Sequence, residues 1–534
     1  MAALPRDVTH DPQDAMPERI VVVGAGVGGL SAALRLAHAG HTVDVVEAAP
    51  GPGGKMRTRD SAAGPIDIGP TVMTMRDVFE DLFASVGERL SDHVTLHADH
   101  VLARHWWRDG STLDLFAEPE QSAAAVRAFA GPRAEAEFRA FSATARTLYD
   151  AFDRPVMREP SPNLAGLTAQ VLARPGLIPA MAPGLTLARS LRLRFSDPRL
   201  RQLFGRYATY VGGSPYLSPA ILGLIWNSEA RGVWSIEGGM HRLARAIHAL
   251  AEARGARFHF GTHVREIETD GARVAGVTLS TGRRLPAGRV LFNGDPKALH
   301  DGYLGDGLRA AVPKRAVAPR SLSAFVWGFA AEPRGVHLAH HNVFFCADPA
   351  LEFGDIAKGR MPRDATLYVC AQDRGGMARP EGLERFEIIM NGPPGHTASD
   401  EDRETCRTRT FETLARMGLD FSPAPEVTHL TTPADFDTAF PASDGSLYGR
   451  SPHGMMATFH RPGARTKVTG LYLCGGGTHP GAGIPMACLS GRHAAEAIET
   501  DLASTSTCRP TAMPGGMSTA SPTMANGPSR SSAS

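Results

Sequence analysis

The alternation of apolar and polar positions is most regular near the start of the chain. Residues 20–23 are all apolar, which predicts a short strand buried on both faces. Apolar residues between positions 30 and 37 then recur at i, i+3, i+4 and i+7, which predicts a helix that ends at Gly40. Valines at 43, 45 and 46 predict a second strand, and Glu47 follows it. The stretch therefore predicts a β-α-β unit.

A glycine motif lies between the first strand and the helix of this unit. Gly24, Gly26 and Gly29 have the spacing G-x-G-x-x-G, in which the first permits a tight turn, the second lets the backbone approach a pyrophosphate, and the third lets helix and strand pack closely. The helix N-terminus offers N–H groups and partial positive charge to phosphates. Glu47 lies where a carboxylate can accept hydrogen bonds from an adenosine ribose. Together these features predict a dinucleotide site on a Rossmann-like fold.

The pattern changes several times along the rest of the chain. Residues 100–230 lose the strand–helix alternation and show longer helical patterns, whereas residues 255–267 predict a strand and residues 273–285 a hairpin. Residues 289–296 predict another buried strand, and residues 300–455 are rich in short apolar strands. We therefore predict an α/β dinucleotide-binding domain that is interleaved with an α+β substrate domain. The expected segments are a flexible leader (1–17), a dinucleotide-binding domain (18–100, 231–299 and 456–502), a substrate domain (101–230 and 300–455) and a disordered tail (503–534).

Composition narrows the class of protein. A length of 534 residues suggests two or more domains, and a net charge of +1 argues against nucleic-acid binding. The six cysteines lack C-x-x-C spacing, which argues against a disulfide scaffold, a zinc site or a redox pair and favours a reducing compartment. The first seventeen residues have no apolar core typical of a signal peptide, and no run of 18 or more apolar residues exists. We expect a cytoplasmic protein without a metal.

One helical segment has two possible interpretations. Residues 164–195 combine many apolar residues with Arg174, Arg189, Arg192 and Arg194. An interfacial segment that dips into a membrane has this composition. A pair of surface helices packed on the core has it as well, and the sequence alone leaves both open.

Two further motifs carry a resemblance to a known superfamily. Residues 53–58 (GGKMRT) resemble the second glycine motif of the FAD superfamily that includes amine oxidases and carotenoid desaturases, with Lys55 where an Arg is usual. A lysine still suits phosphate, although it lacks the bidentate fork of arginine. Residues 67–71 (DIGPT) resemble the segment that runs beside the flavin in that superfamily, and Gly238-Gly239-Met240 resembles the return to the flavin domain. The resemblance implies an amine-oxidase-like or GDI-like two-domain fold.

The C-terminal motif narrows the resemblance. Residues 470–490 (GLYLCGGGTHPGAGIPMACLS) closely resemble the C-terminal signature of bacterial-type phytoene (carotenoid) desaturases, and a helix from about Met486 can point its N-terminus at the isoalloxazine carbonyls. Residues 69–83 and 210–234 look most like the 1-hydroxycarotenoid 3,4-desaturases, also called methoxyneurosporene dehydrogenases. The residues then expected to bind FAD are Gly24, Gly26, Gly28, Gly29, Glu47, Gly53, Gly54, Lys55, Met56, Arg57, Gly69, Pro70, Thr71, Val264, Gly475, Gly476, Gly483, Ile484 and Met486.

The resemblance implies an enzyme of carotenoid biosynthesis. Flavin would remove a hydride from an allylic carbon of a long isoprenoid chain, and loss of a proton from the next carbon would extend the conjugation. Because conjugation stabilises the cation, positioning matters more than a strong base, and no catalytic residue is assigned. So apolar a substrate predicts peripheral attachment to the inner (or photosynthetic) membrane. Oxygen and a membrane quinone both remain possible electron acceptors, and the oligomeric state is left open.

Other residues are weaker candidates for a role in catalysis, metal binding or substrate binding. His241, Glu237 and His479 are polar groups near the expected flavin, for which structural roles are favoured over proton transfer. The histidines at 337, 340 and 341 lack an acidic or Cys partner nearby in the sequence, so metal binding is disfavoured. Apolar runs at 220–226, 322–330 and 343–346 are candidates for a substrate tunnel. The alternatives kept are phytoene desaturation, another FAD enzyme (an amine oxidase, polyene isomerase or retinol saturase), and a non-enzymatic isoprenoid binder like the Rab GDP-dissociation inhibitors.

Overall fold

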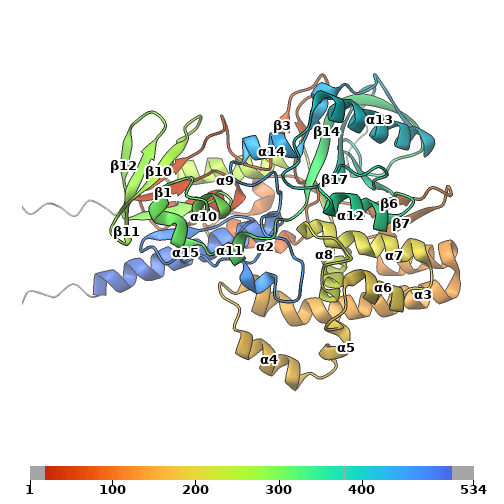
Figure 1. Cartoon of the computed structure of the whole chain (residues 1–534), viewed down its shortest axis with the longest axis horizontal. Coiled ribbons are helices and arrows are strands. Elements are labelled where there is room, and N and C mark those ends of the chain that lie inside the picture. The colour runs from red at the N-terminus through yellow and green to blue at the C-terminus, as the bar shows by residue number, and fades with distance from the viewer. Residues whose placement is uncertain (1–18, 377–379, 508–534) are drawn as a thin grey trace, which may run out of the picture.

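The cofactor-domain sheet is parallel and is assembled from segments far apart in the sequence. A computed structural model of the protein describes residues 19–376 and 380–507. Five parallel strands lie in the order β20-β13-β1-β2-β9, on the left of Figure 1. Their bounds are β1 Ile20–Val23, β2 Val43–Val46, β9 Arg257–His259, β13 Arg289–Phe292 and β20 Leu471–Leu473.

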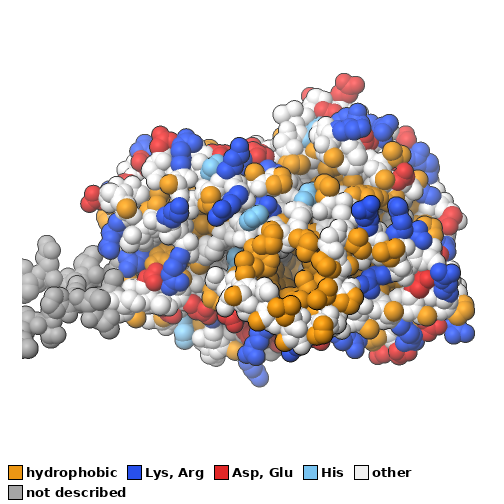
Figure 2. All heavy atoms as spheres, turned by 60° about the horizontal axis from the view of Figure 1, so that its bottom comes forward, with side chains coloured by type: hydrophobic (Ala, Val, Ile, Leu, Met, Phe, Trp, Pro, Cys, Tyr) orange, Lys and Arg blue, Asp and Glu red, His pale blue; other side chains and the backbone are white. Residues whose placement is uncertain are grey.

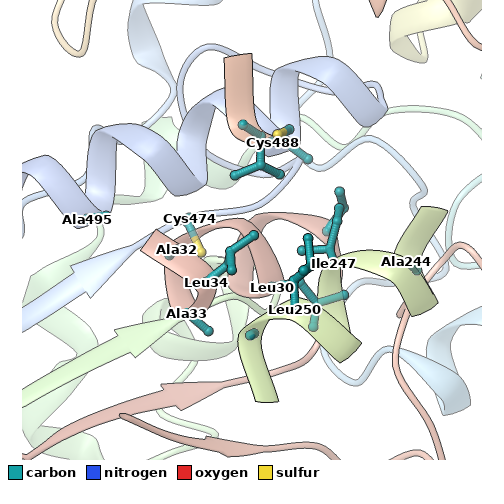
Figure 3. Close-up of a cluster of buried hydrophobic side chains, with 14 of the residues drawn as sticks. Leu30, Ala32, Ala33, Leu34, Ala244, Ile247, Leu250, Cys474, Cys488 and Ala495 are labelled. Carbon is teal, nitrogen blue, oxygen red and sulfur yellow. The ribbon is translucent and has the colours of Figure 1, made fainter. Parts of the chain in front are cut away.

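One face of this sheet is covered by helices. Along β1, Ile20 and Val22 pack into the helical layer while Val21 points to the other face, as the two-residue period of a strand requires. Leu30 and Leu34 of the first helix lie in one buried cluster with Ile247 of the helix at 241–253, as Figure 3 shows. Burying each such leucine contributes about 1.5–3 kcal/mol. The helices of this layer are α1 Val27–His38, α2 Arg76–Ala84, α9 His241–Ala253 and α15 Ile484–Thr507.

The other face is covered by a small antiparallel sheet and short helices. The predicted strand at 255–267 is in fact two strands in different sheets, because the chain leaves the parallel sheet after β9 and begins β10 at Val264. The predicted hairpin at 273–285 is confirmed by β11 and β12. Residues 300–317, expected in the substrate domain, pack here against the parallel sheet. The elements are β10 Val264–Asp270, β11 Arg273–Leu279, β12 Arg284–Pro286, α10 Lys297–His300 and α11 Lys314–Val317.

The second domain is organised around a large mixed sheet. Its strand order is β18-β14-β17-β16-β15-β6-β7, with β19 beside β14. The parallel pairing of β6 with β15, in which Asn342 lies opposite Arg104, joins the two inserted segments into one sheet. The strands are β6 Val101–Trp106, β7 Thr112–Phe116, β14 Ser323–Gly335, β15 His341–Phe344, β16 Leu367–Ala371, β17 Glu384–Gly392, β18 Leu419–Ser422 and β19 Leu430–Thr431. Two short ribbons, β3 Thr58–Arg59 with β4 Ile66–Asp67 and β5 Leu96–Ala98 with β8 Trp234–Ile236, connect the domains.

Helices cover both faces of the second sheet and extend below it in Figure 1. The longest, α3, kinks where Gly131 adopts a positive φ of 89° ahead of Pro132, since proline cannot donate to the preceding turn. Within the described residues, no helix is long and apolar enough to cross a membrane. The helices are α3 Pro119–Phe152, α4 Leu164–Ala173, α5 Leu177–Met181, α6 Leu187–Arg194, α7 Pro198–Gly205, α8 Ile225–Ala230, α12 Pro349–Ala357, α13 Asp400–Arg416 and α14 Pro433–Ala439.

The ends of the chain are only partly described. The predicted leader, residues 1–17, lies outside the described residues. The tail predicted from residue 503 begins too early, because α15 continues to Thr507 by adding backbone hydrogen bonds despite its serine and threonine content. Residues 508–534 lie outside the described part of the chain.

Candidate active site

The first glycine motif forms a tight junction between β1 and α1. Gly24 has a φ of +102°, and a Cβ at Gly29 would lie 2.2 Å from the Gly24 carbonyl oxygen, so strand and helix touch where only glycine fits. Gly26 precedes α1 without capping it through a side chain. The N–H groups of the first helical turn are thereby left for an anionic ligand, which fits the phosphates of a dinucleotide.

Glu47 lies across the glycine turn at the end of β2. Its Oε2 accepts a hydrogen bond of 2.6 Å from the Ala25 N–H, and its Oε1 accepts one of 2.8 Å from the Ala49 N–H. A carboxylate has about four lone-pair sites, so capacity remains for ribose hydroxyls. The carbonyl of Glu47 accepts a hydrogen bond from the Thr262 N–H, and Val264 follows two residues later. This side of the sheet suits the adenosine half of FAD.

Asn293 connects the glycine segments and was not among the predicted site residues. Its Nδ2 donates a 3.1 Å hydrogen bond to the Gly24 carbonyl. A Cβ at Gly26, Gly28 or Gly475 would lie 2.7–2.9 Å from its amide atoms, so Asn293 touches the phosphate loop and the C-terminal motif together. Its one sequence signal is its place directly after a buried strand, because ligands of such sheets bind at the carboxyl ends of the strands.

The second glycine motif packs against the first. Gly53 donates a 2.9 Å hydrogen bond to the Ala25 carbonyl, Met56 is buried behind the turn, and a Cβ at Gly54 would lie 3.0 Å from the Gly26 Cα. The two cations of this motif contact the 436–447 segment instead. Lys55 Nζ donates a 2.6 Å hydrogen bond to the Leu447 carbonyl, and Arg57 lies over the rings of Phe436 and Phe440. Burial lowers the pKa of Lys55 to about 8.

Asp67 packs against the glycine turn that precedes α9. Its carboxylate accepts hydrogen bonds from the N–H groups of Met240 (2.5 Å) and His241 (3.2 Å), which caps the helix. A Cβ at Gly239 would lie 2.4 Å from the Asp67 Oδ2, so the turn requires glycine. Burial raises the pKa of Asp67, although the two N–H donors oppose that shift.

A cavity of about 1130 Å³ begins where the predicted flavin segments meet. Gly69, Pro70 and Thr71 line it from one side, and Gly483, Ile484 and Met486 from the other. Helix α15 begins at Ile484, two residues before its predicted start, so its N-terminal N–H groups lie at the cavity wall. Partial positive charge at this wall suits a flavin ring, on which negative charge develops during reduction.

Behind this wall, the C-terminal motif is fixed by contacts that the sequence did not reveal. Gly475 donates a 2.7 Å hydrogen bond to the Ser490 Oγ. The guanidinium of Arg461 donates hydrogen bonds of 2.8 Å to the carbonyls of Gly476 and Tyr448 and lines the cavity. Burial lowers the pKa of Arg461 to about 10. No motif marks this arginine, because its partners are backbone carbonyls distant in the sequence.

The cavity extends through the second domain and opens at an apolar mouth. Figure 2 shows a hollow ringed by hydrophobic side chains on the face of the molecule that carries α4 and α5. Leu172, 69% exposed, and Leu164, 47% exposed, lie among the lining residues together with Met455 and Met456. Of the three apolar runs considered for a tunnel, 220–226 and 343–346 contribute lining residues, whereas 322–330 is the buried part of β14.

The weaker candidates have structural partners. Glu237 is exposed beside His97, His241 Nε2 lies 2.9 Å from the Pro52 carbonyl, and His479 Nε2 lies 2.8 Å from the Glu159 carbonyl. None of the three lines the cavity. Their roles near the flavin stay predictions.

Two of the three histidines at 337, 340 and 341 have a Cys or acidic partner in the fold, contrary to the expectation from their sequence neighbours. Cys370 Sγ lies 3.6 Å from His340 Nε2, and Asp99 Oδ2 lies 3.7 Å from His341 Nε2, so the fold supplies partners that are distant in the sequence. His340, His341 and Cys370 form a buried group whose ligand-type atoms lie within 4.8 Å of one another. The absence of a metal stays a prediction.

The fold and the site together define an FAD-dependent oxidoreductase of the two-domain type. Residues 27–499 match the flavin containing amine oxidoreductases, and the chain belongs to that family. Among curated relatives, it is 58% identical to the hydroxyneurosporene desaturase of Cereibacter sphaeroides (91% of this chain, 99% of the relative). It is 54% identical to that of Rhodobacter capsulatus (90% and 98%), and 33% identical to the zeta-carotene-forming phytoene desaturase of Myxococcus xanthus (90% and 94%).

Solved structures support the same architecture. Putrescine oxidase has a TM-score of 0.57 at 14% identity (91% of this chain, 99% of that chain), and the cyclohexylamine oxidase of Brevibacterium oxydans has 0.55 at 18% (91% and 100%). At this identity the likeness concerns the fold. The predicted fold class, the FAD cofactor and the family resemblance are confirmed, whereas the individual FAD contacts and the domain boundaries stay predictions.

Proposed function

We propose that the protein is an FAD-dependent carotenoid desaturase that introduces the C-3,4 double bond into an acyclic 1-hydroxy- or 1-methoxycarotenoid. The observation that carries the proposal is the cavity, which connects an apolar mouth with the flavin-facing segments Gly69–Thr71 and 483–486. The hydroxyneurosporene desaturases, similar over nine-tenths of the chain, support the substrate class. A long hydrocarbon matches apolar walls of this extent.

The residues of the chain position the substrate and exclude water. FAD, when bound, supplies a two-electron acceptor for the hydride removed from the allylic carbon. Residues such as Val72, Ile225 and Phe345 line the cavity and hold an extended polyene by burial of apolar surface. The N-terminus of α15 provides N–H groups beside the reacting region. The proton from the neighbouring carbon then leaves a cation that conjugation already stabilises.

We further propose that the mouth of the cavity docks on the cytoplasmic surface of a membrane, from which the carotenoid enters. Helix α4 is almost wholly apolar, yet Leu167 is its one buried residue. Residues 160–196 contain four arginines and no Asp, Glu or Lys. Apolar insertion surrounded by cations suits an anionic lipid surface.

The desaturase proposal is tested with FAD-loaded protein and two liposome preparations, one holding phytoene and the other 1-hydroxyneurosporene. Products are followed by chromatography with absorption spectra. Loss of two hydrogens and a red-shifted spectrum with the hydroxylated substrate alone is the expected result. Conversion of phytoene instead would replace the substrate assignment, and no reaction with either would contradict desaturation.

Membrane docking is tested by vesicle sedimentation. Leu172→Ser, with or without Leu164→Ser, is expected to lower binding to anionic vesicles by about tenfold or more, because each change removes about 1.5–3 kcal/mol of insertion. Tyr303→Ser is the matched control, since Tyr303 is 61% exposed but belongs to the short connection beside the cofactor-domain sheet. Equal binding by all of these proteins would contradict the proposed docking face.

A further inference from the structure

A group of hydrogen-bonded polar side chains lies in the wall of the otherwise apolar cavity. Arg206 and Tyr210 lie on the short 3-10 helix that follows α7, and Glu229 lies on α8. All three line the cavity. Tyr210 donates a 2.5 Å hydrogen bond to Glu229 Oε2, and Tyr207, behind it in the core, donates one of 2.9 Å to Oε1. A charged group in such a wall carries a desolvation cost that a purely structural apolar contact would avoid.

The group retains unused hydrogen-bonding capacity. The Glu229 carboxylate is 2% exposed and has about four lone-pair sites, of which the two tyrosines occupy two. The Arg206 Nε has no acceptor in the part of the chain that the structure describes. Its Nη2 makes one long hydrogen bond of 3.4 Å to the Tyr210 hydroxyl. An acceptor and a cationic donor are therefore both available to a ligand in the cavity.

The group lies near the segment Gly69–Thr71, which is predicted to face the flavin. Tyr368 lies 3.0 Å from the Thr71 Oγ1, which belongs to the segment that follows Gly69. Tyr368 and Tyr210 pack against the same buried cluster around Phe204, as does Val72. The mouth helix α4 packs against a different cluster, around Leu148 and Phe152. The polar group therefore shares its packing with the Gly69–Thr71 side of the cavity and not with the mouth helix.

We propose that Arg206, Tyr210 and Glu229 bind the terminal hydroxyl group of a 1-hydroxycarotenoid and select it over hydrocarbon ends. The inference rests on the proposed function. A hydroxyl is donor and acceptor at once, so it donates to Glu229 and accepts from Arg206. Its oxygen is separated from C3 by three single bonds of about 1.5 Å each. A hydroxyl-binding group must therefore lie beside the carbons that react.

The selection follows because an end without oxygen would leave polar groups of the site without hydrogen-bond partners. With a hydrocarbon end in place, the free lone pairs of Glu229 and the donors of Arg206 lose water and gain no partner. Sites built to bind a hydroxyl reject analogues that lack it by up to about 10⁴-fold. A methoxy end accepts from Arg206 but cannot donate to Glu229, so its rate lies between the two.

The test compares kcat/KM for 1-hydroxyneurosporene, 1-methoxyneurosporene and neurosporene with FAD-loaded protein. For the wild type we expect a preference of at least about 100-fold for the hydroxyl over the hydrocarbon end. Glu229→Gln and Arg206→Met are expected to reduce this preference to less than tenfold. Tyr216→Phe is the matched control, because Tyr216 lines the same cavity outside the group, and should keep the wild-type ratio.

Each outcome decides the inference separately from the proposed function. Equal kcat/KM for the three substrates in the wild type, or an unchanged ratio in both variants, overturns it while desaturation stands. If the wild type desaturates none of them, desaturation fails, and binding is measured instead through quenching of flavin fluorescence. Tighter binding of the hydroxylated carotenoid, lost in Glu229→Gln, would still support hydroxyl recognition, and equal dissociation constants would overturn it. Should the variants not fold, the three-substrate comparison in the wild type decides.

Discussion

Asn293 offers the sharpest test of the cofactor site, because its amide touches the phosphate loop and the C-terminal motif together. Asn293→Asp keeps the size of the side chain, but it places a carboxylate where the Nδ2 donates to the Gly24 carbonyl. Asn293→Ala removes the same hydrogen bond without adding charge. The two variants therefore separate the hydrogen bond from the electrostatic effect.

The magnitudes follow from these contacts. Loss of the hydrogen bond leaves the partly buried Gly24 carbonyl without the Asn293 donor at a cost of about 1–3 kcal/mol, which both variants show as a lower melting temperature. That cost is present with and without FAD, so it largely cancels in the dissociation constant. The added charge opposes the diphosphate by about 2 kcal/mol at an effective dielectric constant near 20. Asn293→Asp is thus expected to weaken FAD binding about 30-fold, and Asn293→Ala less than about fivefold.

The assay is titration of the flavin-free protein with FAD at pH 8, followed by flavin fluorescence and paired with thermal melting. Asn342→Asp is the matched control, because the Asn342 amide likewise donates a hydrogen bond to a backbone carbonyl, that of Ala339 at 2.8 Å, but in the second-domain sheet. It should lower the melting temperature and leave FAD affinity unchanged. The penalty of Asn293→Asp should shrink at high salt. Equal FAD affinity for the Asp and Ala variants would refute the placement of Asn293 at the phosphates.

Three further predictions concern FAD binding and stability. Gly29→Ala should abolish FAD binding, because its Cβ would lie 2.2 Å from the Gly24 carbonyl oxygen. Gly40→Ala is the control: Gly40 has a φ of +89° but open space around it, so the change should cost about 1 kcal/mol of unfolding free energy, measured by thermal melting. Burial raises the pKa of Glu352 from 4.5 to about 7, so the free energy of unfolding should fall by up to about 3 kcal/mol as pH rises through that range, and Glu352→Gln should remove the fall in urea titrations. Burial lowers the pKa of Lys55 from 10.5 to about 8, so unfolding free energy should rise with pH between those values; a flat profile, or one unchanged in Lys55→Met, would contradict the burial of this ammonium.

Local features of the fold could be predicted from the sequence because short-range periodicity determines them. The apolar runs place β1 and β2 at their observed bounds, and Gly40 lies two residues after the observed end of α1. The turn at Gly239 was recognised as well, although its cause, the approach of Asp67, became visible only in the structure. Residues whose role depends on their own backbone conformation can be recognised from the local sequence pattern.

Features that depend on long-range contacts could not be predicted. The pairing of Asn342 with Arg104 joins strands more than two hundred residues apart, and neither strand's sequence indicates its partner. The same holds for Asn293 and Arg461, whose partners are backbone carbonyls and glycines of distant segments. The contact of His340 with Cys370 was not predicted for the same reason, since spacing along the chain is a poor guide to distance in a sheet.

The arrangement of the cavity explains how one cofactor site can serve different substrates. The cofactor domain supplies the glycine-rich segments at 69–71 and 480–486, whereas the walls around Arg206 and Glu229 come from the inserted domain. Arg206 and Tyr210 both line the cavity, and the Arg206 guanidinium lies 5.2 Å from the centre of the Tyr210 ring, while Tyr207 is buried in the core. If that wall binds the substrate end as proposed, a change in it would alter which end is accepted without touching a contact of Asn293 or Gly24. Putrescine oxidase shares the fold at 14% identity, so the architecture tolerates such divergence while the parallel sheet keeps its form.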